Sequence, residues 1–165
     1  VLPDEYLEMV ESKTAVLYGD AAATPAVLLD ADDAVVDALY AYGINSGSAF
    51  QIQDDVLDLT VPSAKLGKQR GSDLVGNKET LITLHARQQG VDVDGLVDAD
   101  DAESLTDADV EDAVATLNEV GSIEYAREKA YSLVDESKRN LEALPDNEAR
   151  SLLAAIAEYL ISRGY

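Results

Sequence analysis

The sequence contains no cysteine, no tryptophan, one phenylalanine and one methionine among its 165 residues. Without cysteine the chain can form no disulfide and offers no thiolate for catalysis or metal binding, which fits a reducing cytoplasm. Because aromatic residues are so few, the core must consist mostly of Ala, Val, Leu and Ile. An apolar fraction of 47% in a chain of this length is enough for one domain with a real core.

Basic residues are also scarce. Twelve Lys and Arg residues stand against 33 Asp and Glu residues, which gives a net charge of -21. This field repels nucleic acid and anionic membranes, so neither is an expected partner. The acids are mostly Asp, as in proteins adapted to high salt, where a dense acidic surface is screened. No apolar run approaches the length of a membrane span and no signal peptide is visible, so we expect a soluble, cytoplasmic protein.

The most informative stretch is Phe50 to Asp58, Phe-Gln-Ile-Gln-Asp-Asp-Val-Leu-Asp, which is predicted to be helical because no helix breaker interrupts it. At about 100° per residue, four polar side chains fall within an arc of about 100° on one side of this helix: Gln51, Asp54, Asp55 and Asp58. Apolar residues flank the strip, and Gly43 and Gly47 on the same line leave space beside the acids. The pattern predicts a carboxylate ladder that lines a cavity.

Aspartates one turn apart repel one another, by roughly a few tenths of a kcal/mol when exposed and by more when desolvated. A cation is therefore expected to hold them together. Oxygen ligands in an i, i+4 pair suit a hard ion such as Mg²⁺, which keeps several waters and is usually completed by substrate phosphates. The alternative is a surface helix of a very acidic protein that carries three aspartates without a metal.

A lysine interrupts the apolar stripe of the first predicted helix, which begins at Pro3-Asp4-Glu5 and ends at Gly19. The residues of this stripe recur at helical spacing and are expected to face the core: Tyr6, Met9, Val10, Val16 and Leu17. Lys13 falls on the core face of this helix, with Thr14 beside it. Since burying an unpaired ammonium is costly, Lys13 should be neutral, paired, or directed at an anion in a cavity. The alternative is a side-chain stem that snorkels to the surface.

A cationic loop follows the acidic helix. Between Thr60 and Asn77 the chain is rich in glycine and carries Lys65, Lys68 and Arg70, and Lys78 follows directly. Flexible glycines combined with basic side chains suit the binding of phosphate oxygens and closure over a substrate. The alternative is a basic loop that pairs with the acidic surface.

The remaining segments are also predicted to be helical. The expected helices run from just after Asp30-Ala31-Asp32 to about Leu59, from Asn77 as the N-cap to Gln89, from Thr106 to Gly121, from Ser122 to Leu144, and from about Leu152 to Gly164. Thr106 and Asp109 have the spacing of a capping box at the start of their helix. Residues 91 to 106 are expected to form an exposed acidic loop. No convincing pair of strands appears, so the predicted fold class is all-α, a helical bundle.

Taken together, these motifs resemble the C-terminal half of the trans-type isoprenyl (polyprenyl) diphosphate synthases. The resemblance rests on Lys13-Thr14, on Phe50-Gln51 leading into Asp54-Asp55-x-x-Asp58, on Gly67-Lys68, and on Gly71-Ser72-Asp73-Leu74 with Lys78. Their order and spacing match over nearly the whole chain. The resemblance implies the isoprenoid synthase fold, with residues 1–165 as the C-terminal part of one domain.

The family carries two aspartate-rich motifs on facing helices, and only the second is present here. The arginine near the first motif and the basic residues that bind isopentenyl diphosphate are missing as well. Because the chain begins at Val1 rather than at Met, we expect it to be a proteolytic product, a truncated form or one half of a split protein. On its own it should have little activity.

The resemblance implies head-to-tail prenyl transfer by a homodimeric enzyme. An allylic diphosphate held by Mg²⁺ loses pyrophosphate, and the double bond of isopentenyl diphosphate attacks the resulting allylic cation. The metal ligands would be Asp54 and Asp58, with Asp55 supporting the site or contacting it through water. The diphosphate would be bound by Lys13, Lys68 and Lys78. Oxygen dipoles would be directed at the cation by Thr14 and Gln51.

The length of the product does not follow from these residues, since the family sets it chiefly around the first motif. Two other functions stay open: a catalytically incompetent homologue or half that serves as a partner subunit, and an acidic helical module that binds cations or another helix. A terpene cyclase fits less well, because Lys13-Thr14 and Gly67-Lys68 favour prenyl transfer.

Overall fold

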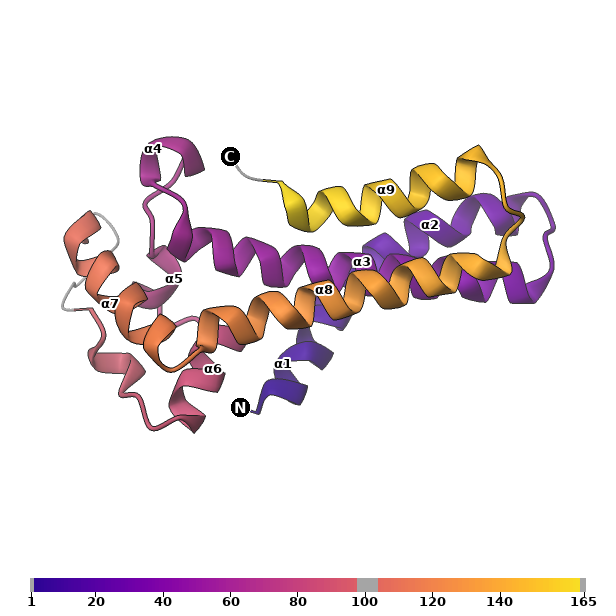
Figure 1. Cartoon of the computed structure of the whole chain (residues 1–165). Helices are drawn as coiled ribbons and strands as arrows, with labels where there is room; N and C mark the ends of the chain where they lie inside the picture. The colour runs from indigo at the N-terminus through magenta and orange to yellow at the C-terminus, as the bar shows by residue number, and fades with distance from the viewer. Residues whose placement is uncertain (1, 98–103, 164–165) are drawn as a thin grey trace. The chain divides into compact units, whose positions relative to one another are not determined.

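The computed structural model describes residues 2–97 and 104–163, and these residues form helices and no strand (Figure 1). The predicted all-α fold class is confirmed. Among the described helices, none is long and apolar enough to cross a membrane.

In chain order the elements are α1 (Pro3–Val10), the π-helical turn η1 (Glu11–Ala15), α2 (Val16–Leu28), α3 (Asp33–Thr60), α4 (Ser63–Leu66), α5 (Ser72–Val75), α6 (Leu81–Gln88), the 3-10 turn η2 (Val93–Gly95), α7 (Asp107–Glu119), α8 (Ser122–Asn140), the 3-10 turn η3 (Leu141–Ala143) and α9 (Glu148–Ser162). They pack into two compact units. Among the described residues, unit 1 consists of residues 2–6, 52–97 and 104–128, and unit 2 of Leu7–Gln51 and Lys129–Arg163. Helices α3 and α8 each contribute to both units.

The helix that carries the acidic stretch begins and ends close to the predicted residues. Helix α3 spans 28 residues and is the longest in the described part of the chain. The predicted capping box before α7 is also confirmed, because the Thr106 side chain accepts from the Asp109 backbone N–H while Asp109 accepts from that of Thr106. Such reciprocal bonds satisfy donors that the first turn of a helix leaves without a partner.

The helix α6 begins later than predicted. Its N-cap is Thr80, which forms a capping box with Thr83. Asn77, the predicted cap, adopts the left-handed conformation with φ of 48° and therefore ends a turn instead of starting a helix. The loop before it contains two one-turn helices, α4 and α5. Within the predicted acidic loop, residues 98–103 lie outside the described part of the chain.

The first predicted helix differs most from the structure. It does not end at Gly19 but continues through η1 and α2 to Leu28. Tyr6 is buried as predicted, at 1% exposure, whereas Leu17 is 66% exposed. The π-helical turn η1 inserts an extra residue and so rotates the helix that follows it. As a result, Ala15 at the end of η1 and Gly19 in α2 face the interior, and Leu17 faces outward.

In unit 2, α2 and α3 approach each other closely at glycines. A Cβ atom on Gly43 would lie 2.3 Å from the carbonyl oxygen of Tyr18 and 2.6 Å from the Cα of Gly19, and one on Gly47 would lie 2.9 Å from the Cα of Ala15. These distances leave no room for a side chain. The prediction that Gly43 and Gly47 leave open space beside the acids is wrong, because the periodicity of one helix does not show which face another helix covers.

The first half of α3 also packs against α8 and α9 within unit 2 (Figure 1). The Tyr42 hydroxyl donates to the carbonyl of Leu153 at 2.8 Å, and the side-chain amide of Asn45 donates to Asn140 at 2.9 Å. These bonds join α3 to segments about a hundred residues later in the chain.

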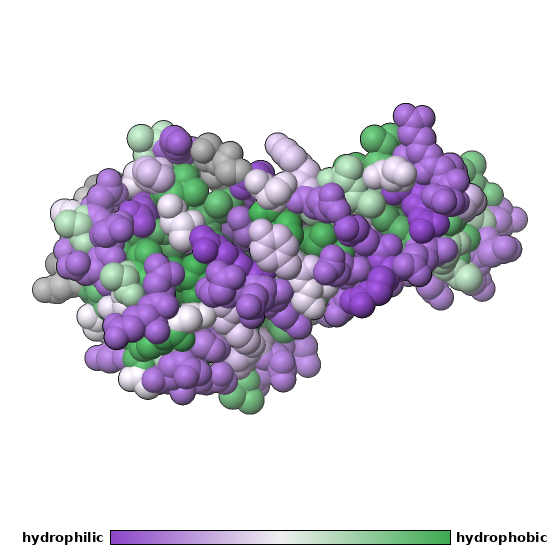
Figure 2. All heavy atoms as spheres, viewed as in Figure 1, coloured by the Kyte–Doolittle hydropathy of each residue, from purple (hydrophilic) through white to green (hydrophobic). Residues whose placement is uncertain are grey.

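Hydrophilic residues cover most of the face seen in Figure 2, as the acidic composition predicts. Apolar residues lie between them. The large apolar side chains of α2 and α9 that are more than half exposed are Leu17, Val27, Leu28, Leu152, Ile156 and Tyr159. This set suits contact with further protein or with an apolar ligand.

Candidate functional site

The site residues predicted from the sequence are divided between the two units. Unit 1 contains Asp54, Asp55, Asp58, Lys68 and Lys78. Unit 2 contains Lys13, Thr14 and Gln51.

Asp58 forms hydrogen bonds that stabilise the turn before α5. Its side chain is fully buried, at 0% exposure. The Oδ1 atom accepts from Lys68 Nζ at 2.7 Å and from Ser72 Oγ at 3.0 Å, and Oδ2 accepts from the backbone N–H of Asp73 at 3.1 Å. The Asp58 backbone carbonyl accepts a further bond from the N–H of Gly71 at 2.8 Å. Both carboxylate oxygens of Asp58 are therefore already engaged within the protein.

Asp55 holds a second lysine in the same way. Its side chain is 3% exposed. The Oδ1 atom accepts from Lys78 Nζ at 2.8 Å, and Oδ2 accepts from the Tyr6 hydroxyl at 2.5 Å. Lys78 Nζ also donates to Asp73 Oδ2 at 2.7 Å. The Lys78 side chain is 43% exposed, so its ammonium lies between two carboxylates and still meets solvent.

The electrostatics of unit 1 keep both lysines charged at neutral pH. Desolvation alone would lower the pKa of Lys78, but Asp55 and Asp73 outweigh it and the pKa is raised. Desolvation of Lys68 is outweighed in the same way, mainly by the hydrogen bond and charge of Asp58, and its pKa is also raised. Burial raises the pKa of Asp55 despite the opposing effect of Lys78.

Asp54 differs from the other two aspartates of the motif. It is only partly buried, and its charge helps to raise the pKa of Lys68. In the parts of the chain that the structure describes, no three His, Cys, Asp or Glu side chains are grouped so that they could hold a metal ion. Mg²⁺ is nevertheless often bound by one or two carboxylates together with substrate phosphates. A partly buried carboxylate such as that of Asp54 fits a cation that arrives with a diphosphate.

In unit 2, the predicted residues of the first helix lie on the π-helical turn η1. Such turns are frequent at functional sites. Thr14 Oγ1 donates to Gln51 Oε1 at 3.4 Å, a long bond that links η1 to α3. Lys13 is exposed. The prediction that Lys13 lies on the core face is wrong, because the π-helical turn shifts the register on which that prediction depended.

Phe50, directly before Gln51, is held by two neighbours within unit 2. Its ring centroid lies 5.6 Å from that of Tyr18, and the guanidinium of Arg163 lies 4.2 Å from the centroid. Arg163 was not predicted as a site residue, because a single arginine after the last helix gives no periodic signal.

Tyr6 and Asp73 were not predicted as site residues from the sequence, although both belong to the hydrogen-bonded group around Lys78. A signal for Tyr6 did exist, since a tyrosine on a buried stripe needs a hydrogen-bond partner for its hydroxyl. For Asp73 the only signal in the sequence was its position in the basic loop, and that position does not indicate where its side chain points.

An apolar pocket of about 420 Å³ lies in unit 2. It borders α2, the helix that directly follows η1 and its Thr14. Its lining comes from α2, α3 and α9 and is almost entirely apolar: Leu17, Tyr18, Ala21, Ala22, Tyr42, Gly43, Ser46, Leu153, Ile156 and Leu160. A pocket of this kind suits a hydrocarbon ligand.

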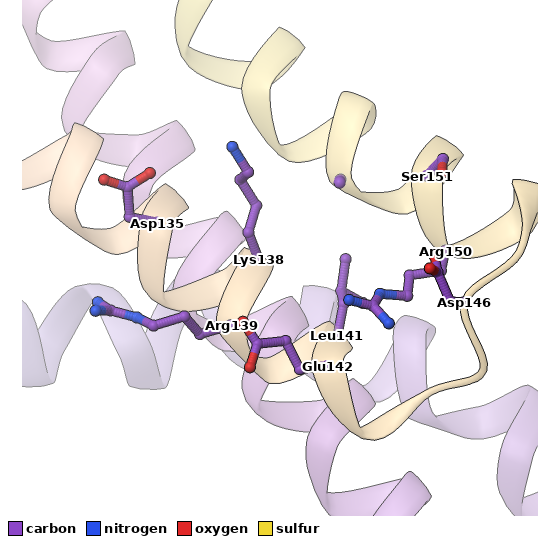
Figure 3. Close-up of a pocket in the computed structure, with 9 residues that line it drawn as sticks. Asp135, Lys138, Arg139, Leu141, Glu142, Asp146, Arg150 and Ser151 are labelled. Carbon is purple, nitrogen blue, oxygen red and sulfur yellow. The ribbon is translucent and has the colours of Figure 1, made fainter.

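A second pocket in unit 2, of about 540 Å³, lies where α8 ends and α9 begins (Figure 3). Three basic and three acidic side chains line it: Lys138, Arg139, Arg150, Asp135, Glu142 and Asp146. Lys138 is paired with Glu158 at 2.5 Å. We propose no ligand for this pocket, because its charges balance and none of the predicted site residues lines it.

Comparison with known proteins gives consistent matches. The family model described as polyprenyl synthetase matches residues 2–117. The geranylfarnesyl diphosphate synthase of Natronomonas pharaonis is 60% identical over 165 residues, which are 100% of this chain and 47% of that protein.

Solved structures also match this chain. The geranylgeranyl pyrophosphate synthetase of Geoglobus acetivorans has a TM-score of 0.81 at 39% identity, over 99% of this chain and 48% of that one. The polyprenyl synthase of Caulobacter crescentus, solved in complex with calcium and isoprenyl diphosphate, has a TM-score of 0.82 at 32% identity, over 96% of this chain and 49% of that one. The chain thus spans about half the length of the relatives that it matches.

Proposed function

Because the chain belongs to the polyprenyl synthetase family, we propose that it serves in prenyl transfer, the condensation of an allylic diphosphate with isopentenyl diphosphate to a longer isoprenyl diphosphate. The observation that carries this proposal is a pair of half-exposed lysine side chains in unit 1, Lys68 and Lys78, each of which forms an ion pair with a buried aspartate. The relatives named as diphosphate synthases support the same reaction class.

The lysines match the charge that this reaction develops. When an allylic diphosphate ionises, negative charge grows on the departing pyrophosphate, and preorganised cations stabilise it without reorganising. Lys68 and Lys78 are held in place by Asp58 and Asp55 before any substrate binds. We assign both lysines to the diphosphate. Lys13, exposed on η1 in unit 2, stays a predicted diphosphate ligand.

We assign Mg²⁺ to Asp54, with the substrate diphosphate completing its shell. When bound, Mg²⁺ would neutralise charge on the diphosphate oxygens. The carboxylates of Asp55 and Asp58 would act on the diphosphate mainly through their lysines. The calcium and isoprenyl diphosphate in the Caulobacter relative support a divalent cation at a site of this family.

Unit 2 by itself has features that suit an allylic substrate. Thr14 and Gln51 are joined by a hydrogen bond, and we propose that their oxygen dipoles face the developing allylic cation. The apolar pocket between α2, α3 and α9 suits a prenyl chain, because it is lined almost entirely by apolar groups.

The test is calorimetric titration of the chain with farnesyl diphosphate in molar potassium chloride, with and without Mg²⁺. We expect binding that requires Mg²⁺ and is lost in Asp54→Asn. Asp112→Asn is the matched control, because Asp112 is an exposed aspartate of α7 in the same unit. Binding that ignores both Mg²⁺ and Asp54→Asn, or no binding at all, would contradict the proposal.

A partner-subunit function is the second candidate, and it is favoured by the exposed apolar side chains of α2 and α9, which suit contact with further protein. A chimera separates the two candidates: these residues replace the aligned segment of the Natronomonas relative, to which they are 60% identical. Turnover of labelled isopentenyl diphosphate by the chimera supports a catalytic half. A well-folded chimera without turnover supports the partner subunit.

Two further proposals concern assembly and habitat. We propose a homodimer, which light scattering in high salt would test. We also propose adaptation to high salt, because a net charge of -21 is self-repelling unless it is screened; unfolding at low ionic strength would support it.

A further inference from the structure

In unit 1, four side chains form a continuous hydrogen-bonded chain from the core to the surface. The Tyr6 hydroxyl donates to Asp55, Lys78 Nζ donates to the other oxygen of Asp55, and Lys78 Nζ also donates to Asp73. Tyr6 is 1% exposed, whereas the Lys78 side chain is 43% exposed. We call this set, Tyr6, Asp55, Lys78 and Asp73, the Tyr6–Lys78 chain.

Tyr6 sets the orientation of the Asp55 carboxylate. A carboxylate can rotate about its last bond unless both oxygens are held. The Tyr6 bond holds Oδ2 at 2.5 Å, which leaves Oδ1 directed at Lys78. Tyr6 remains a hydroxyl donor at neutral pH, because burial and then the neighbouring Asp55 raise its pKa.

Asp73 is fixed independently of Tyr6. Its backbone N–H donates to Asp58 Oδ2 at 3.1 Å, and its carbonyl accepts from the backbone N–H of Lys78 at 3.0 Å. Two interactions therefore join Asp73 to Lys78: this backbone hydrogen bond and the ion pair of 2.7 Å between Lys78 Nζ and Asp73 Oδ2. Asp73 therefore offers its carboxylate to the ammonium from a defined position.

The two carboxylates use two of the three N–H donors of the Lys78 ammonium. The third N–H can donate to a ligand oxygen in a direction that the first two determine. A lysine side chain held in this way loses less conformational freedom when a ligand binds. An unrestrained lysine would lose this conformational freedom on ligand binding, and that loss would weaken the binding.

We propose that Tyr6 and Asp73 are positioning residues that aim the Lys78 ammonium at the diphosphate of the substrate, Tyr6 through Asp55 and Asp73 directly. This inference rests on the proposed function, because it takes a diphosphate as the ligand of Lys78. Tyr6 contributes from the core and does not itself contact the substrate.

The test measures the rate at which an amine-reactive reagent labels each lysine of the 165-residue chain, read by mass spectrometry. In Tyr6→Phe we expect Lys78 to be labelled about five-fold faster, because a hydrogen bond to the carboxylate that holds it is lost. Lys68 is the internal control, since its carboxylate is Asp58, and its rate should stay the same. If both rates rise together, the variant has loosened the whole unit and the inference is contradicted.

Inorganic pyrophosphate with Mg²⁺ then tests the link to the ligand. It should protect Lys78 in the native chain, and Tyr6→Phe and Asp73→Asn should each need about five to ten times more pyrophosphate for the same protection. Asp73→Asn is the second variant because Asp73 is partly exposed and nearly isosteric with Asn. Equal protection in all three proteins would overturn the positioning role while leaving the proposed function intact. No protection of Lys78 in the native chain would contradict both.

Discussion

Replacing Asp58 by asparagine should cost far more stability than the same change at Asp54. Asn keeps one acceptor oxygen, so one of the groups now bonded to the carboxylate, the Lys68 ammonium, the Ser72 hydroxyl or the Asp73 N–H, loses its partner. A hydrogen bond to a charged group contributes about 1.5 to 3 kcal/mol, and a buried group left unpaired costs about 1 to 3 kcal/mol. The ion pair adds no more than about 1 kcal/mol, because the Lys68 side chain is 48% exposed. We expect a total loss of about 2 to 4 kcal/mol in the free energy of unfolding.

Urea unfolding followed by far-ultraviolet circular dichroism in molar potassium chloride measures this loss. Asp54→Asn is the matched control, since Asp54 lies on the same helix but is only partly buried, and its effect should stay within about 0.5 kcal/mol. Equal losses for the two variants would refute the structural role of Asp58. So would a loss below about 1 kcal/mol for Asp58→Asn.

Two further predictions concern alkaline pH and helix packing. The pKa of Lys78 is raised above its ordinary value of 10.5, so the stability that it contributes is complete below that pH and is lost as the pH rises through the folded-state pKa. Lys78→Met should reduce this alkaline loss in urea titrations above about pH 10, and an unchanged slope would contradict the role of Lys78. Gly43→Ala would bring a methyl group within 2.3 Å of the Tyr18 carbonyl oxygen and should cost about 2 to 3 kcal/mol in thermal unfolding. Gly76→Ala is its control, because an added Cβ there meets nothing closer than 3.4 Å; equal losses would show that the close approach of the helices is not the cause.

The sequence by itself determined the helical class and several boundaries, because both depend on local chemistry. Helical periodicity and the lack of breakers predicted α3 to within a few residues of its observed ends. The capping box of Thr106 and Asp109 followed from a spacing of three residues. The same local argument placed Asp54, Asp55 and Asp58 on one helix, and the order of the short motifs indicated the family that the matches show.

Tertiary structure alone decided what those aspartates do. The partner of Asp55 in the core is 49 residues away in the chain, and no periodicity links the two. The sequence predicted open space beside Gly43, but α2 lies directly against it. The π-helical turn at Lys13 shifted a register that the sequence pattern assumed to be regular. In each case the cause is a contact between segments distant in the chain or a local departure from regular geometry, and a pattern of residue types along one helix carries no information about either.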